Sequence, residues 1–340
     1  YHPIGKYQII DQVQEAVAGY SDLEDGVFEN VPAIVFGDHT RIVKYVDQPF
    51  FLGADGVKVL RSRFKDANYR YLYYALKSVK IPNTGYNRHF KWLKEAKIYY
   101  PNSEEQSKIV SILDGISSVI EHRQQELQKL DELVKARFIE LFGDPLGNDK
   151  GWQKVLITEV CHAIFGGGTP SKSHPEYFAG SIPWVSPKDM KSSVINDSID
   201  HITEDAIAHS TTNLVPANSV LMVIRSGILK HTLPVAINSL PVTINQDMKA
   251  FVPNETVKTA FLLYFFKAIE NDVLAGVRGV TADNIDFKAF QKRTIIVPPL
   301  ALQEQFVAFV TQTDKSKVAV QKALDEAQLL FDSLMQKYFG

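Results

Sequence analysis

Ten lysine and arginine side chains crowd into residues 61–97, where only Asp66 and Glu95 carry negative charge. Five tyrosines and Trp92 are interleaved with these cations. Cations neutralise nucleic-acid phosphates and neighbouring side chains contact bases, so the pattern is typical of a nucleic-acid surface. It also fits a solvated helix face whose aromatic side chains turn toward a core.

A glycine-rich loop is the second chemical candidate. Residues 165–171 read Phe-Gly-Gly-Gly-Thr-Pro-Ser. The loop lacks the Lys-Ser/Thr ending of a P-loop and the glycine spacing of a dinucleotide fingerprint. Thr169-Pro170 also disfavours an immediate helix start. We therefore expect a flexible loop that brings backbone close to a partner, with DNA as one candidate, rather than a nucleotide site.

Catalytic patterns are missing from the rest of the sequence. It has no His/Glu cluster with metal-helix spacing, no Gly-x-Ser-x-Gly elbow and no Asn-Pro-Pro-aromatic tetrapeptide of adenine methyltransferases. Its single cysteine, Cys161, excludes an internal disulfide and a cysteine-based zinc site. A lone thiol fits a reducing compartment. We expect no catalytic residue and no metal ligand.

Length and composition bound the architecture. A chain of 340 residues suggests two domains, because single cores rarely grow past about 250 residues. The apolar fraction of 45% and charged fraction of 22% are ordinary globular values. A net charge of −2 argues mildly against nucleic acid. That total averages residues 1–60, with 4 cations and 9 carboxylates, against the basic stretch.

An internal repeat divides the chain in two. Residues 84–143 align with 281–340 without a gap, with 13 identities in 60 positions. The identities include Asn87 with Asn284, Phe90-Lys91 with Phe287-Lys288, and Gln106 with Gln303. We expect an α/β (α+β) protein with domains at 1–100 and 150–297 and helical segments at 101–143 and 298–340. The offsets predict that the first domain is short by roughly 30–45 residues at its N-terminus.

Both helical segments have apolar residues at the spacing of a heptad repeat. In the first segment Arg123 and Arg137 occupy two of these positions, and in the second Thr313 and Lys317 interrupt the apolar series. A sustained 3.5-residue period favours a coiled coil over a helix packed on its own domain. We expect the helices to pair antiparallel as a pseudo-twofold. The apolar face, here called the seam, comprises Ile109, Leu113, Ile116, Ile120, Leu127, Leu130, Val134, Leu141, Phe306, Val310, Val320, Leu324, Phe331 and Leu334.

Each globular segment reads as strands followed by a helix. In the first, strands are expected near 33–36, 42–45 and 57–60, with a helix near 69–78. In the second, strands are expected near 220–225, 234–237 and 250–252, with a helix near 259–271. Pro101 and Pro298-Pro299 precede the two long helices, and Gly143 and Gly340 end them.

These features resemble the DNA-specificity subunit of type I restriction-modification systems. The second domain opens on Trp152 and a run similar to that family's "GGTPS … G-x-IPW … D" pattern. Other similar runs mark the central strands and the entries to the long helices. The residues that carry the resemblance are 166–171, 180–189, Arg225-Ser226-Gly227, Ile244-Asn245-Gln246, Pro298-Pro299-Leu300 with Gln303-Glu304-Gln305, Pro101 with Glu105-Gln106, and 31–37.

The resemblance implies a cytoplasmic, non-catalytic subunit. Each recognition domain would read one half of a split double-stranded DNA target, mostly through the major groove. The paired helices would separate the halves and dock two modification (methyltransferase) subunits. Those partners would bind S-adenosylmethionine, and restriction subunits that use ATP would join them. The chain itself would hold no cofactor and would contact no membrane.

Major-groove readout uses Arg or Lys on guanine and Asn or Gln on adenine. On that basis we predict DNA contacts in both domains. The predicted residues are Thr40, Arg41, Lys44, Arg88 and His89 in the first domain, and Thr169, Ser171, Lys188, Arg225, Lys230 and Arg278 in the second.

Two other functions remain open on the sequence. One is a coiled-coil interaction scaffold, or an inhibitor, that binds no DNA. The other is a fragment of a fused methyltransferase–specificity enzyme. The basic stretch at 61–97 favours DNA recognition over the scaffold, and the missing methyltransferase tetrapeptide counts against the fused enzyme for this chain.

Overall fold

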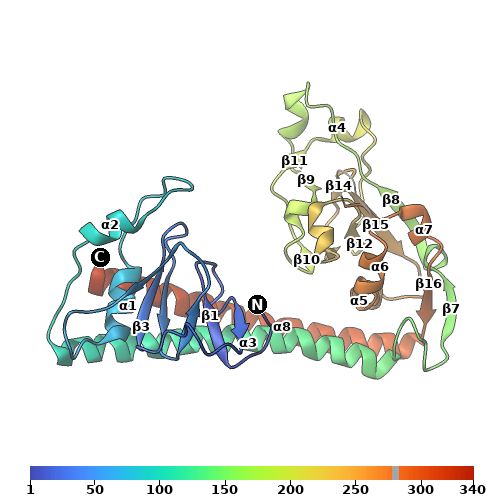
Figure 1. The fold of residues 1–340 in the computed structure, drawn as a ribbon. Coiled ribbons are helices and arrows are strands. Elements are labelled where there is room, and N and C mark those ends of the chain that lie inside the picture. Colours follow the sequence, from blue (N-terminus) through green and yellow to red (C-terminus); the bar gives the residue numbers. More distant parts are fainter. Residues whose placement is uncertain (278–282) are drawn as a thin grey trace. The chain divides into compact units, whose positions relative to one another are not determined.

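The computed structural model describes residues 1–277 and 283–340 of the chain. These residues form two units: residues 1–126 with 320–340, and residues 127–319 (Figure 1). Two 40-residue helices, α3 (Ser103–Phe142) and α8 (Leu300–Phe339), contribute to both. We call them unit 1 and unit 2 and describe each by itself.

Unit 1 carries two three-stranded sheets and two short helices. One sheet has the order β2-β1-β5 and the other β4-β3-β6, in which β3 is central and pairs antiparallel with both neighbours. The elements are β1 (Tyr7–Ile10), β2 (Gly19–Ser21), β3 (Ala33–Gly37), β4 (Val43–Val46), β5 (Phe50–Leu52), β6 (Val57–Leu60), α1 (Tyr69–Lys77) and α2 (Phe90–Glu95).

Two apolar clusters hold unit 1 together. The first lies between the sheets and includes Ile10, Val35 and Phe50. The second joins α1 to both long helices: Tyr71 and Tyr74 pack with Ile109 and Leu113 of α3 and with Phe331 of α8. An early part of α3 therefore meets a late part of α8, which is antiparallel pairing.

Unit 2 is built on a five-stranded sheet of order β10-β13-β12-β15-β8, with smaller sheets β11-β9-β14 and β16-β7. The strands are β7 (Gln153–Leu156), β8 (Cys161–Gly166), β9 (Ile182–Val185), β10 (Val194–Ile195), β11 (His201–Ile202), β12 (Val220–Val223), β13 (Val235–Asn238), β14 (Thr243–Ile244), β15 (Met248–Pro253) and β16 (Thr294–Val297). The helices are α4 (Glu204–Ala208), α5 (Thr259–Ala268), α6 (Glu270–Ala275) and α7 (Phe287–Phe290), with 3₁₀ turns η1 (Ile157–Val160), η2 (Pro175–Phe178), η3 (Pro187–Asp189) and η4 (Gly227–Lys230).

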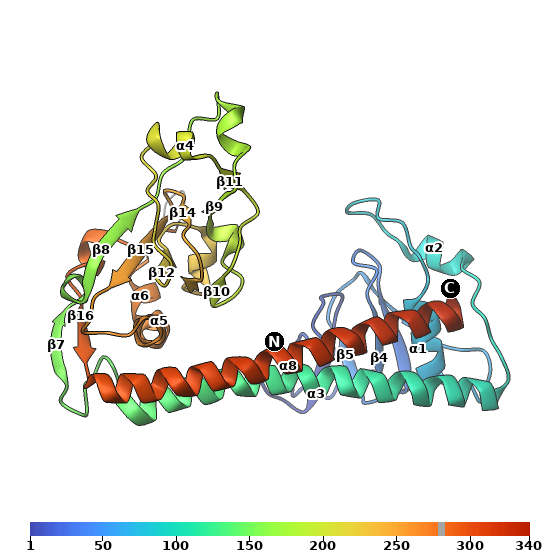
Figure 2. The same cartoon turned by 180° about the vertical axis from the view of Figure 1, so that it is seen from behind.

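The core of unit 2 is one large cluster between the five-stranded sheet, α5 and the long helices. Every residue of β12 is buried, as expected of a central strand, and α5 is apolar around most of its surface. Here Phe306 of α8 meets Phe138 and Phe142 of α3, with ring centroids 5.5 Å apart in both pairs. The pairing is again antiparallel, as the views in Figures 1 and 2 show for the helix segments of this unit.

The repeated glutamines perform the same task in both copies. Gln106 Nε2 donates to the Pro101 carbonyl at 2.8 Å, and Gln303 Nε2 donates to the Pro298 carbonyl at 2.9 Å. Both side chains are buried, so each ties the start of a long helix to the proline before it. At the other end of α3, Gly143 has φ +75°, the left-handed conformation of a glycine cap.

Every residue of the predicted seam is buried or half-buried, on both helices. The exception to the register lies at the end of α3. The heptad pattern assigns Arg137 to the face that meets the partner helix, whereas the fully buried residues at this end are Phe138 and Phe142. Arg137 is half-buried, with its guanidinium carbon 5.8 Å from the centre of the Phe309 ring of α8. The heptad pattern missed Phe138 and Phe142 because the helix end packs against α5 of the globular domain as well as against α8, which favours the i, i+4 spacing of a broad face. Coiled-coil geometry along the full length stays a prediction.

The strands expected in the two globular segments, and the helix expected in the first, are confirmed within about two residues at each end. One expectation was wrong: the helix predicted at 259–271 is two helices, α5 and α6, which meet at Ile269. No strand was predicted in residues 1–21 or 153–202. Three of the strands found there, β2, β10 and β11, are only two or three residues long, too short to give an alternating pattern. No helix in residues 1–277 or 283–340 has both the length and the apolar content needed to cross a membrane.

Candidate nucleic-acid interface

Unit 1 has a cation-lined cavity of about 740 Å³ between β4, α1 and the chain after α1. Arg41 and Lys44 line it from one side, and Arg70, Lys77 and Lys80 from the other. The cavity thus combines two predicted contact residues with three cations of the basic stretch. Such a concentration of positive charge suits an anionic ligand such as a DNA phosphate.

Lys44 is less available than its charge suggests. Its side chain is only 8% exposed, and its Nζ donates to the Glu15 carbonyl at 2.6 Å. Burial lowers the pKa of Lys44, and the carboxylates of Asp11 and Glu15 offset part of that effect. Lys44 therefore shapes the wall of the cavity, and its ammonium group is already engaged inside the protein.

Arg41 and Thr40 lie in the tight turn between β3 and β4. Arg41 has φ +65°, an uncommon conformation for a residue with a side chain. Its Nη1 donates to the Ile81 carbonyl at 3.3 Å, while its buried Nε has no hydrogen-bond partner within the described residues. Thr40 is exposed and accepts a hydrogen bond from the Ile42 amide. The turn thus presents Thr40 to solvent and aims Arg41 into the cavity.

Arg88 and His89 are neighbours with opposite surroundings. Arg88 is exposed in the loop before α2, as is Tyr86, which is 86% exposed and stacks on His39 with ring centroids 4.6 Å apart. His89 is fully buried, and its ring is hydrogen bonded to the Asp38 carbonyl at 3.0 Å. Since the His89 ring has no exposed surface, it does not offer the direct DNA contact that the sequence predicts, and it instead positions the loop that bears Arg88.

The tyrosines of the basic stretch divide between core and surface. Tyr71 and Tyr74 are fully buried against the long helices, which is the core arrangement that the sequence left open. Arg70 lies over the Tyr74 ring and reaches Asp114, with its Nε 2.7 Å from a carboxylate oxygen. Burial and the hydrogen bond to Asp114 raise the pKa of Tyr74 to about 12. This part of the stretch therefore attaches the globular domain to α3.

In unit 2 the glycine-rich loop is held rigidly from two sides. A Cβ on Gly167 would lie 1.6 Å from the Asn245 carbonyl oxygen, so only glycine fits there. Trp184 Nε1 donates to the Gly168 carbonyl at 3.0 Å. The expectation of a flexible loop was therefore wrong: close backbone packing and the Trp184 bond fix its path. Thr169 emerges from this loop and donates its hydroxyl to Gln246 Oε1.

Gln246 lines an open groove of about 1030 Å³ on unit 2. Among the predicted contacts that the structure describes, only Arg225 lines this groove. Lys249, Asn284 and Lys288 line it too and were not predicted. Residue type alone did not distinguish these three, although the repeat had marked Asn284 and Lys288. Together the groove offers two lysines, an arginine and the three carboxamides of Gln246, Asn284 and Gln291, beside one carboxylate, Asp286. Lysine, arginine and carboxamide side chains are those that contact phosphates and base edges.

The cations beside the groove are loosely held. Arg225 Nη1 lies 3.8 Å from the Asp247 carboxylate, and Lys230 Nζ lies 3.8 Å from that of Asp283. Both distances exceed hydrogen-bond range. Both cations are more than half exposed, so their charged groups are accessible to a DNA phosphate, although the carboxylates that they face are largely buried. Lys188 differs: its Nζ is 2.6 Å from Asp200, and that hydrogen bond is the main cause of its raised pKa.

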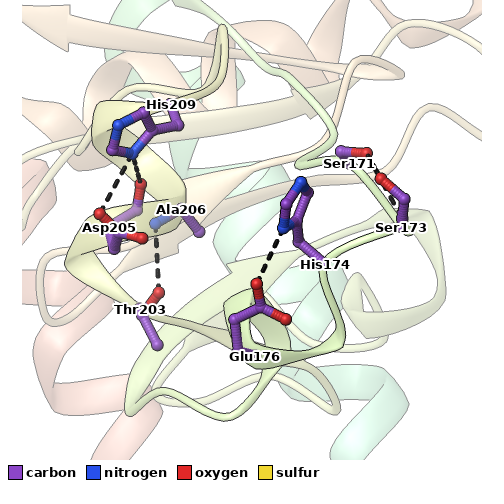
Figure 3. A network of polar contacts seen from close by, with 8 residues as sticks. All are labelled: Ser171, Ser173, His174, Glu176, Thr203, Asp205, Ala206 and His209. Carbon is purple, nitrogen blue, oxygen red and sulfur yellow. Dashed lines mark hydrogen bonds and ion pairs between the residues drawn. The ribbon is translucent and has the colours of Figure 1, made fainter.

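Ser171 lies apart from the groove, in a region where histidines meet carboxylates. Its hydroxyl is 2.7 Å from that of Ser173. Figure 3 shows His174 bonded to Glu176 and His209 bonded to Asp205 nearby. The structure thus brings Arg225 and Thr169 to the groove region and leaves Ser171 and Lys188 elsewhere. Arg278, the remaining predicted contact, lies outside the described residues.

Both halves of the chain match one family of known proteins. The model for the type I restriction modification DNA specificity domain matches residues 19–132 and 149–327. The chain belongs to the type I restriction-modification DNA specificity family. The family identified from the sequence is therefore confirmed. The match extends into both units.

Individual relatives agree with this assignment. The chain is 30% identical over 338 residues to the specificity subunit of a type I restriction enzyme from Escherichia coli, covering 92% of this chain and 81% of that protein. It is 24% identical over 264 residues to a specificity subunit from Methanocaldococcus jannaschii, covering 72% of this chain and 60% of that relative.

Solved structures of this specificity family share the fold. The S subunit of the type I restriction-modification system from M. genitalium superposes with a TM-score of 0.58 at 17% identity, covering 99% of this chain and 90% of that one. A chain from a structure on complex assembly of the type I restriction-modification system gives 0.55 at 19% identity, covering 92% and 82%. At these identities the likeness concerns the fold, which agrees with the mixed helix and strand architecture expected from the sequence.

Proposed function

We propose that this chain is the DNA-recognition subunit of a type I restriction-modification complex and catalyses no reaction itself. One recognition domain comprises residues 1–100 and the other 150–297, and each reads one half of a bipartite double-stranded target. The observation that carries the proposal is the family match in both halves of the chain. Two copies of a DNA-specificity module in one chain suit a target with two separate half-sites.

The grooves described above support contact with DNA. Each unit presents clustered cations beside an opening: Arg41, Arg70 and Lys77 in unit 1, Arg225 and Lys249 in unit 2. Their local positive charge offsets a net charge of −2 for the whole chain. Association with DNA should therefore depend steeply on salt, since each neutralised phosphate releases counterions.

The long helices are the proposed docking surface for partners. Apolar side chains remain exposed on their outer faces, a pattern typical of an interaction surface. In unit 1 these are Val119, Leu329 and Leu330, and in unit 2 they are Leu133, Ile139 and Val318. We propose that two modification (methyltransferase) subunits dock there. Those subunits would bind S-adenosylmethionine, restriction subunits with ATP would join them, and the assembly would work in the cytoplasm.

Methylation profiling tests this function. Genomic DNA from cells that express the chain with its neighbouring methyltransferase should carry methylated adenines in one bipartite motif. Deleting the chain, with the methyltransferase retained, should abolish that motif. A motif that persists without the chain would contradict the proposal, and so would methyl transfer by the pure chain with S-adenosylmethionine.

The same profiling separates the alternative, a scaffold or inhibitor without DNA binding. Such a protein would leave the methylated motif unchanged or reduce methylation when added. A DNA reader would create a motif and change it when its globular domains are exchanged.

A further inference from the structure

The two units place matching residues around the end of their central strand. In unit 1 β3 lies between antiparallel β4 and β6, and in unit 2 β12 lies between antiparallel β13 and β15. Beyond each central strand an amide bonds across to the neighbour: Asp38 N to the Gly56 carbonyl, and Ile224 N to the Asp247 carbonyl, both at 2.8 Å. These equivalent bonds show which residues correspond, independently of side-chain type.

Lysines occupy two corresponding positions in both units. Lys58 pairs across from Phe36, and Lys249 pairs across from Met222. We call the Asp38 and Ile224 amides the matched amides, and the Gly56 and Asp247 carbonyls that accept from them the matched carbonyls. Phe36 and Met222 each lie two residues before the matched amide of their unit, so the two lysines correspond. The second pair comes from the sequence repeat, which aligns Lys91 of α2 with Lys288 of α7. We call these four residues the shared lysines.

Different side chains occupy two further corresponding positions. The residue after the matched amide is His39 in unit 1 and Arg225 in unit 2. The residue before the matched carbonyl is Asp55 in unit 1 and Gln246 in unit 2. We call these the variable positions. In unit 2 both line the groove that also contains Lys249 and Lys288.

We infer that each unit contacts DNA through this constellation, which in unit 1 is separate from the cation-lined cavity, with the shared lysines on phosphates and the variable positions on base edges. The inference rests on the proposed function and adds the residues that perform it. Phosphates are the same at every half-site, so both units can use the same cation at the same place. Base edges differ between half-sites, so the side chains that read them must differ.

The chemistry of the variable positions fits base reading. Arginine pairs with guanine O6 and N7, and glutamine pairs with adenine N6 and N7. An aspartate such as Asp55 accepts a hydrogen bond from cytosine N4. In unit 2 the Thr169 hydroxyl bonds to Gln246 Oε1, which orients the carboxamide before DNA arrives. The two units are therefore expected to read unlike half-sites.

The shared lysines are positioned for phosphates. Lys249 Nζ lies 4.9 Å from the centre of the Phe287 ring, which holds the lysine stem at the wall of the groove. Lys288 is exposed one residue further along α7. In unit 1 a different shared lysine, Lys91, lies over the Trp92 ring at 4.2 Å. Each unit therefore holds one of its shared lysines against an aromatic ring, although the two rings are not at corresponding positions.

Salt-dependent binding tests the phosphate contacts. The probe is a pool of labelled duplexes of random sequence, bound to the full chain at 50 to 200 mM NaCl and followed by fluorescence anisotropy. Replacing Lys249 and Lys288 by Gln should lower the slope of log affinity against log salt by about 1.8, from about 0.9 per phosphate. Between 50 and 200 mM NaCl the DNA affinity of the wild type should therefore fall by a factor about twelve times larger than that of the variant.

Two controls make that result specific. Lys249→Arg with Lys288→Arg keeps both charges and should keep the wild-type slope. Lys315→Gln with Lys322→Gln removes two exposed lysines of α8 and should leave the slope unchanged. A thermal unfolding curve for each variant establishes that the chain is folded when it is measured.

Selection from a randomised DNA library tests the base contacts. Arg225→Ala or Gln246→Ala should relax the preference at one base position of one half-site by about 5- to 150-fold, and should leave the other half-site unchanged. The corresponding substitution Asp55→Ala should alter only the opposite half-site.

The outcomes separate this inference from the proposed function. A wild-type chain that binds no duplex DNA overturns the proposed function. A wild-type chain that binds DNA, with an unchanged slope in the Lys249/Lys288 glutamine variant, overturns the inference alone. Unchanged sequence preference in the Arg225 and Gln246 variants overturns the inference as well.

Discussion

Phe138 is the residue at which the heptad pattern and the tertiary structure disagree, so its substitution separates them. The side chain is 1% exposed. Its ring centroid lies 5.5 Å from that of Phe306 on α8 and 5.7 Å from that of Phe261 on α5. The heptad register instead assigns Arg137 to the face that meets the partner helix. Arg137 Nη1 lies 2.8 Å from a carboxylate oxygen of Glu140.

We predict that Phe138→Ala lowers the free energy of unfolding of unit 2 by about 3–5 kcal/mol, the usual cost of removing a buried phenylalanine ring. With a urea m-value of about 3 kcal/mol per M, the unfolding midpoint falls by about 1–1.7 M. Ile139→Ala is the matched control because that neighbour is 47% exposed. Its expected change is within about 0.5 kcal/mol.

Tryptophan fluorescence during urea unfolding measures the effect. Trp152 Nε1 donates to the Phe142 carbonyl at 2.8 Å, so it reports on the same end of α3. In a Trp92→Phe background the remaining tryptophans, Trp152 and Trp184, both belong to unit 2. Equal shifts for Phe138→Ala and Ile139→Ala would refute the packing argument. A larger loss for Arg137→Ala than for Phe138→Ala would restore the heptad register at this end.

Four further predictions concern the helices and the thiol. Leu127→Asp or Leu324→Asp, each in the half-buried seam, should weaken helix pairing and partner binding together, and unchanged assembly in a pull-down with the methyltransferase would contradict this. Gln303→Ala removes the hydrogen-bond partner of the Lys258 amide and of the Pro298 and Thr256 carbonyls. The free energy of unfolding, measured by thermal unfolding, should therefore fall by about 1–3 kcal/mol. Gln305→Ala, at an exposed position, is the control. Burial raises the pKa of Cys161 from 9.0 to about 12. At pH 8 this lowers the thiolate fraction about a thousandfold, while the higher nucleophilicity of the more basic thiolate offsets about twentyfold of that loss. A thiol reagent at pH 8 should therefore react about 50-fold more slowly with the folded than with the unfolded chain. Because that pKa is raised on folding, the thiol's contribution to stability is complete below pH 9 and is lost as pH rises from about 9 to about 12, which urea unfolding of wild type against Cys161→Ala would measure.

The contact residues show where sequence reasoning stops. The residue type of Arg225 predicts a DNA contact and Arg225 does line the unit 2 groove, whereas Lys249 and Lys288 line the same groove without having been predicted. His89 was chosen by type and is fully buried. A charged or polar residue type says what a side chain can bind, but its exposure depends on strands and loops that pack from elsewhere in the chain.

The sequence by itself determined the repeat, the two long helices, the central strands and the family. These features depend on patterns that are local along the chain: apolar spacing, a proline before a helix, a glycine after it. Only the tertiary structure decided that Phe138 replaces Arg137 in the core, that the glycine loop is fixed by Asn245 and Trp184, and which cations share a groove. The physical reason is that each of these depends on contacts between segments far apart in the sequence, where packing against a neighbouring element overrides a local period.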